Sequence, residues 1–241
     1  MHEMHSWHCI CLAPLDRMDG TYPIKQGVLT LAIFGKIDNE QLAFQREWHD
    51  WARAENTTSM DLALLEGQDI NEIVLDGRTA ASIAGLEGKL RLFDFLRDRG
   101  ADLNKLDGND MNALMCAAFG GSVKIAAKIL ARGDPAAHLS LTNSKGQTPL
   151  HFAALSGRAE MAQLLISRGS AVNATDMDGN TPLHFSMKGG SPLAVKTLLS
   201  GGADTGAENA KGQSAAKFSG GQAACRQALD AGGHSFSGMG I

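Results

Sequence analysis

A fixed spacing between glycine residues runs through most of this 241-residue chain. Consecutive glycines that close similar apolar tracts are separated by 33, 33, 36 and 33 residues, at Gly67, Gly100, Gly133, Gly169 and Gly202. A second set keeps the same register, with a small polar residue at Thr79, Asn112, Thr148, Thr181 and Ser214. The longer interval holds three extra residues near the tract "DPAAH". Two sets in step indicate an internal repeat, in which the repeat position of a residue decides its role.

One unit, residues 146–173, predicts a helix, a turn, a second helix and a loop. Thr148 is a good helix N-cap, and Pro149 suits the first helical position. Gly157 ends the first helix, and "AEMAQLLIS" predicts a second one that ends at the left-handed turn of Gly169. The tract "SAVNATDMDG" then carries Asn, Asp and Gly at spacings typical of a hairpin-like loop. Neither helix can bury its apolar face alone, so the units must stack.

Two tracts carry a recognisable signature, "TPLHFA" at 148–153 and "TPLHFS" at 181–186. They match the Thr-Pro-Leu-His-x-Ala motif of the ankyrin-repeat family, the second with Ser in place of Ala. The units that begin at Thr79 and Asn112 lack the Pro and His but keep the Ala and Gly positions. The chain therefore resembles the ankyrin-repeat family over residues 76–231. This resemblance implies an all-α solenoid of about five to six stacked helix-turn-helix units joined by hairpin loops.

Four segments are expected along the chain: an N-terminal arm at 1–23, a degenerate helical cap or repeats at 24–75, ankyrin repeats with a C-terminal cap at 76–231, and a flexible tail at 232–241. In the second segment, "GVLTLAIFGK" resembles the first helix of a repeat but falls outside the 33-residue register. Trp48 and Trp51 lie three apart on the expected helix "EQLAFQREWHDWARAE". They predict an N-terminal cap that seals the solenoid core, with a partner contact as the alternative.

Composition and charge limit the possible functions. The formal net charge of −4 offers no basic excess to neutralise phosphates, which argues against a nucleic-acid partner. No segment has the roughly 18 to 20 apolar residues of a membrane span, and the N-terminus lacks the basic region of a secretory signal. Four cysteines, at positions 9, 11, 116 and 225, are too few and too scattered for a disulfide framework. We therefore expect a protein of the reducing cytoplasm.

The histidines His151 and His184 are the first candidates for catalysis, because a His near a Thr could pair a base with a nucleophile. No Asp or Glu completes a triad in both copies. The two residues occupy the same repeat position, where the resemblance implies that the ring hydrogen-bonds its own turn and its neighbour. Cys116 and Phe152 also share one repeat position and are expected in the core. We expect no catalytic residue and no cofactor, so the chain is predicted not to be an enzyme.

The N-terminus holds a second candidate site, because five possible metal ligands lie within eleven residues: His2, His5, His8, Cys9 and Cys11. A closed zinc site usually takes its ligand pairs from two separate segments, and this tract has no partner cluster downstream. The preferred interpretation is a terminal arm over the first repeat, with no metal. A metal-dependent enzyme that uses this tract is the less favoured alternative.

The resemblance also implies where a partner protein would bind. In this family the concave surface is formed by the loop tips and by two residues near the end of each first helix. The matching positions here are Leu75, Asp76, Arg78, Leu86, Glu87, Asn109, Met111, Phe119, Lys145, Gln147, Leu155, Met177, Asp178, Asn180, Lys188, Lys211 and Gln213.

Three of these positions, Leu86, Phe119 and Leu155, are equivalent in successive repeats and predict an apolar stripe. An exposed apolar stripe is typical of a protein interface; packing against adjacent helices or the N-terminal arm is the alternative. We therefore expect a non-catalytic module that binds one protein partner, as an adaptor or regulatory subunit. An inhibitor or immunity protein that blocks a toxin or enzyme is the other candidate function.

Overall fold

The structure is a computed structural model that describes residues 39–74, 76–131, 134–218 and 223–233. It divides into two units, residues 1–45 and residues 46–241, and the second unit contains the repeats. Within the described ranges, regular structure is helical apart from one isolated bridge between Glu208 and Ser214. This confirms the all-α fold class that the sequence predicts.

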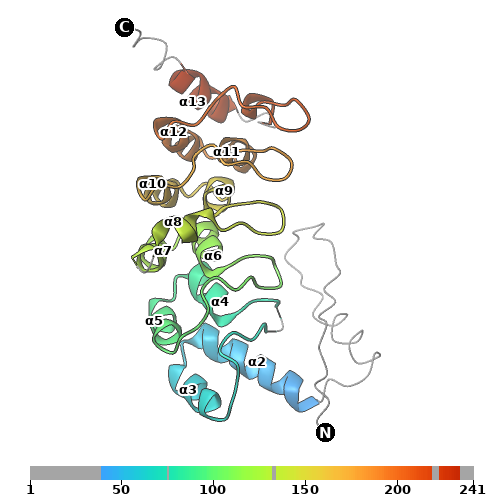
Figure 1. The fold of residues 1–241 in the computed structure, drawn as a ribbon, viewed down its shortest axis with the longest axis vertical. Coiled ribbons are helices and arrows are strands. Elements are labelled where there is room, and N and C mark those ends of the chain that lie inside the picture. Colours follow the sequence, from blue (N-terminus) through green and yellow to red (C-terminus); the bar gives the residue numbers. More distant parts are fainter. Residues whose placement is uncertain (1–38, 75, 132–133, 219–222, 234–241) are drawn as a thin grey trace. The chain divides into compact units, whose positions relative to one another are not determined.

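Helices of the second unit form two rows (Figure 1). The inner row contains α4 (Ala80–Glu87), α6 (Ala113–Gly120), α9 (Pro149–Leu155), α11 (Pro182–Gly189) and the 3₁₀ helix η1 (Ala215–Phe218). The outer row contains α5 (Leu90–Asp98), α7 (Val123–Leu130), α10 (Ala159–Ser167), α12 (Pro192–Ser200) and α13 (Ala223–Gly233). Each helix packs against the next one in its row, so the units stack as the repeat requires.

The polar residues of the repeat begin the inner helices, as predicted. The Thr79 hydroxyl accepts a hydrogen bond from the backbone N–H of Ser82 at 3.1 Å, and the Asn112 side chain accepts one from Met115 at 2.9 Å. At Thr148 and Thr181 a proline takes the first helical position, and the histidine at the third accepts a hydrogen bond from the backbone N–H of the threonine. The N-cap and the first turn are therefore the most reliable marks of each repeat.

Small residues let the inner helices approach one another closely. A Cβ atom added to Gly120 would overlap the carbonyl oxygen of Leu86, and one added to Gly189 would overlap the carbonyl oxygen of Leu155. The backbones therefore meet near the C-terminal ends of these helices, which places consecutive helix ends side by side.

The three extra residues of the third interval form part of a short helix, α8 (Pro135–Ser140). The Asp134 side chain caps it by accepting a hydrogen bond from the Ala136 N–H at 2.9 Å, and Leu139 is buried. The insertion therefore extends the connection after α7 without disturbing the stacking of α7 on α10.

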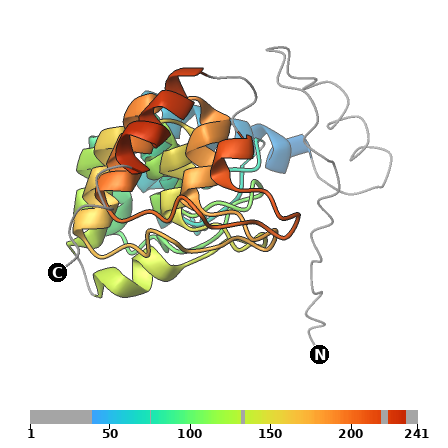
Figure 2. The ribbon, with the colours of Figure 1, turned by 90° about the horizontal axis from the view of Figure 1, so that it is seen from above.

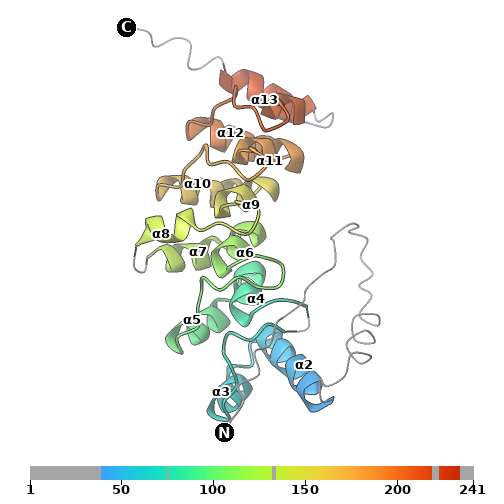
Figure 3. The same ribbon diagram turned by 45° about the vertical axis from the view of Figure 1, so that its right-hand side comes forward.

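In the described part of the chain, the helices α2 (Asn39–Ala54) and α3 (Thr57–Leu65) precede the repeats (Figure 3). Trp48 is fully buried and Trp51 is partly exposed. Trp48 is thus a core side chain, and its role in a cap over the repeats stays a prediction. The expected arm at 1–23 and the tract "GVLTLAIFGK" lie outside the described residues. Of the expected tail at 232–241, residues 232 and 233 belong to α13 and the others lie outside the description.

Candidate functional site

In four successive loops between repeats, the side chain at the start of the tip turn holds the loop. The Asp107 carboxylate accepts hydrogen bonds from the backbone N–H groups of Asn109 at 2.9 Å and Met111 at 3.1 Å. Asn143, Asp176 and Asn209 make the same pair of bonds in the next three loops. These side chains therefore shape the loop tips.

Neighbouring loop tips are joined by hydrogen bonds, and the loops lie on one side of the helices (Figure 2). The Met177 N–H donates to the Lys145 carbonyl oxygen at 2.9 Å, and the Ala210 N–H donates to that of Asp178 at 2.8 Å. Between the loop that contains Asp107 and the loop that contains Asn143, the Asp110 carboxylate accepts a hydrogen bond from the Ser144 N–H at 2.9 Å and another from the Ser144 hydroxyl. The tips thus form a continuous, ordered surface.

The two candidate histidines link one repeat to the next. Nδ1 of His151 accepts a hydrogen bond from the backbone N–H of Thr148 at 3.1 Å, while Nε2 lies 3.1 Å from the Asn180 carbonyl oxygen. A carbonyl only accepts, so Nε2 carries the proton and the ring is neutral. Burial lowers the pKa of His151, against weaker opposite effects of the Asn180 carbonyl and Asp176.

His184 repeats this arrangement, with Nδ1 at 3.2 Å from the Thr181 nitrogen and Nε2 at 2.9 Å from the Gln213 carbonyl oxygen. This confirms the structural role predicted for both histidines. In the described ranges, no three His, Cys, Asp or Glu side chains are grouped as metal ligands would be. The cluster of His2, His5, His8, Cys9 and Cys11 lies outside those ranges.

The predicted apolar stripe lies at the ends of three stacked inner helices. Leu86, Phe119 and Leu155 are all partly exposed, whereas the residues before them on the same helices are buried. Lys188 takes the equivalent position on α11 and is exposed. The stripe thus consists of three apolar side chains followed by a lysine.

The predicted loop-tip residues differ in exposure. Lys145, Asp178, Lys211 and Met177 are exposed, the last at 76%. Asp76, Arg78, Asn109, Met111, Gln147 and Gln213 are partly exposed, and Leu75 lies outside the described residues.

The structure corrects the prediction that Asn180 belongs to the partner-binding surface. Its side chain is 8% exposed, donates to Asp176 at 3.2 Å and accepts from the Asn209 amide at 2.9 Å. Asn180 therefore joins two loops inside the protein and does not face a partner.

Two side chains of α2, which sequence reasoning did not place here, contact carboxylates in the N-terminal part of the surface. His49 Nε2 lies 3.2 Å from an Asp76 carboxylate oxygen, and Arg78 Nε lies 3.6 Å from the same oxygen. Arg53 reaches both Asp76 at 3.7 Å and Glu87 at 3.3 Å. Helix α2 lies outside the 33-residue register, so the repeat pattern could not predict these contacts.

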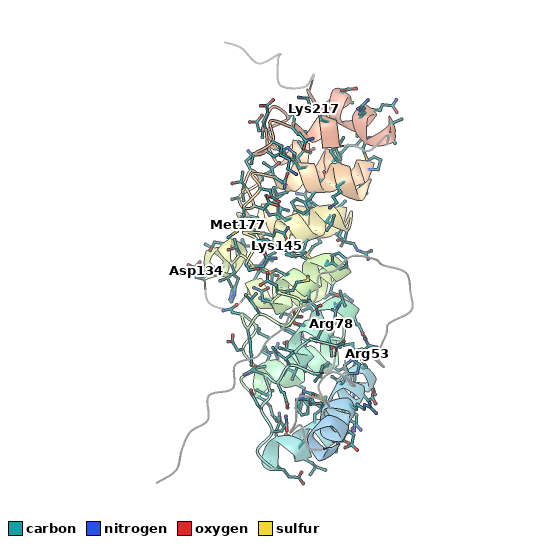
Figure 4. All side chains as sticks on the ribbon, turned by 90° about the vertical axis from the view of Figure 1, so that its right-hand side faces the viewer. Arg53, Arg78, Asp134, Lys145, Met177 and Lys217 are labelled. Carbon is teal, nitrogen blue, oxygen red and sulfur yellow. The ribbon has the colours of Figure 1, made fainter. Side chains whose placement is uncertain are left out.

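In the C-terminal part, Lys145, Lys188 and Lys211 form no ion pair with any described residue. Figure 4 shows Arg53 and Arg78 toward one end of this surface, Lys145 and Met177 near its middle, and Lys217 toward the other end. Unpaired cations therefore lie on both sides of the exposed Met177.

Comparison with known proteins agrees with this architecture. Two family models match the chain: one for ankyrin repeats in many copies over residues 79–130, and one for three copies over residues 126–209. Together they span more than half of the chain. The chain belongs to the ankyrin-repeat family. Its ankyrin repeats form a protein-interaction module.

The ankyrin repeats are similar to segments of much longer proteins. Delta-latroinsectotoxin-Lt1a of Latrodectus tredecimguttatus is 38% identical over 79 residues, which are 33% of this chain and 6% of the toxin. The inactive serine/threonine-protein kinase TEX14 of Mus musculus is 27% identical over 133 residues, 55% of this chain and 9% of the kinase. The probable E3 ubiquitin-protein ligase XBOS31 of Oryza sativa subsp. japonica is 34% identical over 101 residues, 42% of this chain and 22% of the ligase. The chain thus spans under a quarter of each relative.

None of the helices in the described ranges has the length and apolar character needed to cross a membrane.

Proposed function

We propose that the ankyrin repeats bind one partner protein through the concave face and the loop tips, and that the chain acts as an adaptor or regulatory subunit. The partly exposed stripe of Leu86, Phe119 and Leu155 is the observation that carries this proposal. Apolar side chains at equivalent positions of stacked helices offer a contiguous surface, and apolar anchors supply much of the affinity in protein interfaces.

Met177 extends this surface to the loop tips. It is 76% exposed and is held by a backbone bond to the neighbouring loop at Lys145. An exposed thioether side chain adapts to many apolar partners, and the ammonium groups of Lys145 and Lys211 favour carboxylates beside it. These features support a partner segment with both apolar and acidic side chains.

The role is proposed to be non-catalytic and cytoplasmic. Both histidines of the repeat signature are used within the fold, and Cys116 is a buried free thiol, as suits a reducing compartment.

A double variant, Phe119→Glu with Leu155→Glu, tests the surface. Affinity capture with mass spectrometry should recover a partner with the wild type but not with the double variant. Light scattering of the purified complex should give one copy of each protein. Leu193→Glu is the matched control, because Leu193 is 64% exposed on the outer helix α12 and should keep the partner.

Circular dichroism decides between the two interpretations of the stripe. A folded double variant that loses the partner supports the interface. A double variant that no longer folds would instead show that Phe119 and Leu155 are packed core residues. Retention of the partner by a folded double variant would contradict the proposal.

A further inference from the structure

The outer row of helices is open between α3 and α5. From α5 onward each outer helix packs on its successor, and the Lys128 ammonium bonds the Asp94 carboxylate at 2.6 Å between α5 and α7. Between α3 and α5 there is instead a hollow of about 240 Å³. Its walls include Leu62 and Leu65 of α3 and Phe95 of α5. This hollow lies on the outer row, away from the inner-helix ends that carry the stripe.

The apolar wall of this hollow is unusually exposed. Leu65 is 82% exposed and Leu62 is 59% exposed, while Met60 and Ala63 on the other side of α3 are buried. Thr58, Asp61, Leu62 and Leu65 form one stripe of α3 at helical spacing. The hollow is open to solvent, and Leu62, Leu65 and Phe95 give it an apolar wall that an apolar side chain of a partner can contact.

The polar lining of this hollow and of an adjoining one includes three carboxylates, together with Arg99 and neutral Thr and Gln side chains. Asp61 lines this hollow, and Asp69 and Asp98 line an adjoining one of about 520 Å³ that shares Arg99 with it. Arg99 is already engaged, because it bonds both Asp61 oxygens at 2.6 Å and its guanidinium lies 4.5 Å from the centre of the Phe95 ring.

The other two carboxylates remain accessible. The Asp69 and Asp98 side chains are 62% and 60% exposed. Their neighbours are Lys105, at 3.9 Å from Asp69, and Arg97, at 2.8 Å from Asp98. Each carboxylate thus keeps room for a further cation from a partner.

We propose that the surface formed by α3 and α5 is a second docking site, which takes an amphipathic helix of another protein with an apolar anchor and a neighbouring Lys or Arg. The anchor fills the space between Leu62, Leu65 and Phe95, and the cation lies beside Asp69 and Asp98. A helix laid along a groove between two helices buries its apolar face in this way. The site is separate from the concave surface, so it would let the chain hold two proteins at once.

The test uses a fluorescein-labelled 18-residue helical peptide of Leu, Ala and Lys with its leucines on one face. Two further peptides replace every Lys by Glu, or every Leu by Gln. Fluorescence anisotropy with the full chain should show binding of the Lys peptide, at least about tenfold weaker binding of the Glu peptide, and a similar loss for the Gln peptide.

Variants locate the peptide on the protein. Leu62→Gln with Leu65→Gln should weaken the Lys peptide at least about tenfold, since apolar contact is lost. Asp69→Asn with Asp98→Asn should weaken it and reduce its salt dependence. Leu193→Gln is the matched control for an exposed outer-row leucine and should bind as the wild type does. The exposure of these leucines predicts unchanged melting temperatures, which circular dichroism checks.

Several outcomes would overturn the proposal. The proposal fails if the Lys peptide does not bind, or if the Glu or Gln peptide binds as tightly as the Lys peptide. It also fails if Leu193→Gln weakens the Lys peptide as much as the Leu62/Leu65 change does, or if the Leu62/Leu65 change does not weaken it. Sedimentation of the chain alone supplies one more: a dimer abolished by the Leu62/Leu65 change would make this surface a contact between two copies. The Phe119/Leu155 variant should leave peptide binding unchanged, so this test is independent of the proposed concave-face function.

Discussion

The Nε2 atom of His151 donates a hydrogen bond to the carbonyl oxygen of Asn180, 3.1 Å away in the loop that precedes the next repeat. The opposite nitrogen accepts from the N-cap of its own helix. The ring also meets Phe185 of the next repeat edge to face, with 5.2 Å between ring centroids. A single neutral imidazole therefore fixes a helix start, a loop and the spacing between two repeats.

Acid should weaken the fold through His151. Burial lowers the pKa of His151 in the folded state. As the pH falls below about 6.5, the unfolded chain therefore binds a proton at this residue more readily than the folded chain does. The unfolding free energy should therefore fall between pH 7.5 and pH 5.5. Urea titrations at both values measure this fall. In His151→Gln the fall should be smaller than in the wild type; an unchanged fall would contradict the assignment to His151.

Replacing Asp107 by Asn should preserve or raise stability at neutral pH. Burial raises the pKa of Asp107, which means that its charge is disfavoured in the fold, although the N–H groups of Met111 and Asn109 partly offset this. Asn keeps the oxygen that accepts those bonds, as Asn143 and Asn209 do in later loops. The change in unfolding free energy at neutral pH should therefore be zero or positive.

The pH dependence of that gain follows from the same shift. The cost of the buried charge appears as pH rises above about 3.9, where the unfolded Asp ionises first. The difference between variant and wild type should therefore be larger at pH 7 than at pH 3.5, as measured by urea unfolding. Asp107→Leu serves as the control: it removes the acceptor and should destabilise the protein at both values. A loss of stability in Asp107→Asn at pH 7 would refute this account of the loop.

Changing Gly120 to Ala should destabilise the protein even though Ala is the better helix former. Ala normally gains about 1 kcal/mol over Gly within a helix, but here its Cβ would overlap the Leu86 carbonyl group. Forced separation of packed elements costs about 1–3 kcal/mol, so the sign should be reversed. Thermal unfolding checks this against Gly206→Ala, whose Cβ would meet only the end of the Asp204 side chain at 3.3 Å. Equal stability of the two variants would argue against close inner-helix packing.

Much of the fold was predictable because each repeat carries its own residues that start and end helices. The tract "AEMAQLLIS" was predicted as a helix, and α10 spans Ala159–Ser167, the same residues. The histidine contacts followed from their repeat position. Helix α8 was not predicted, although Asp134 followed by Pro135 is a standard helix start, because six residues are too few to show a periodic pattern.

The candidate site was less predictable, since exposure depends on what lies opposite. Repeat position suggested Asn180 as a contact, but the Asn209 side chain of the next loop covers it. The pairing of Asp76 with Arg53 and the hollow between α3 and α5 depend on how non-repeating helices pack on the first repeat. A 33-residue register holds no information about those distances.

The Cys116 thiol should be inert while the protein is folded. It is fully buried on α6, and burial, with the nearby Asp107 carboxylate, raises its pKa to about 12. Thiolates are the reactive form, and reagents also need access, so both factors protect this residue. N-ethylmaleimide at pH 7.5 should leave the Cys116 peptide unlabelled in the native protein and label it fully in guanidinium chloride, as read by peptide mass spectrometry. Gly120→Ala, which is expected to open the same helix packing, should speed labelling; rapid labelling of the native wild type would show that α6 is not packed as described.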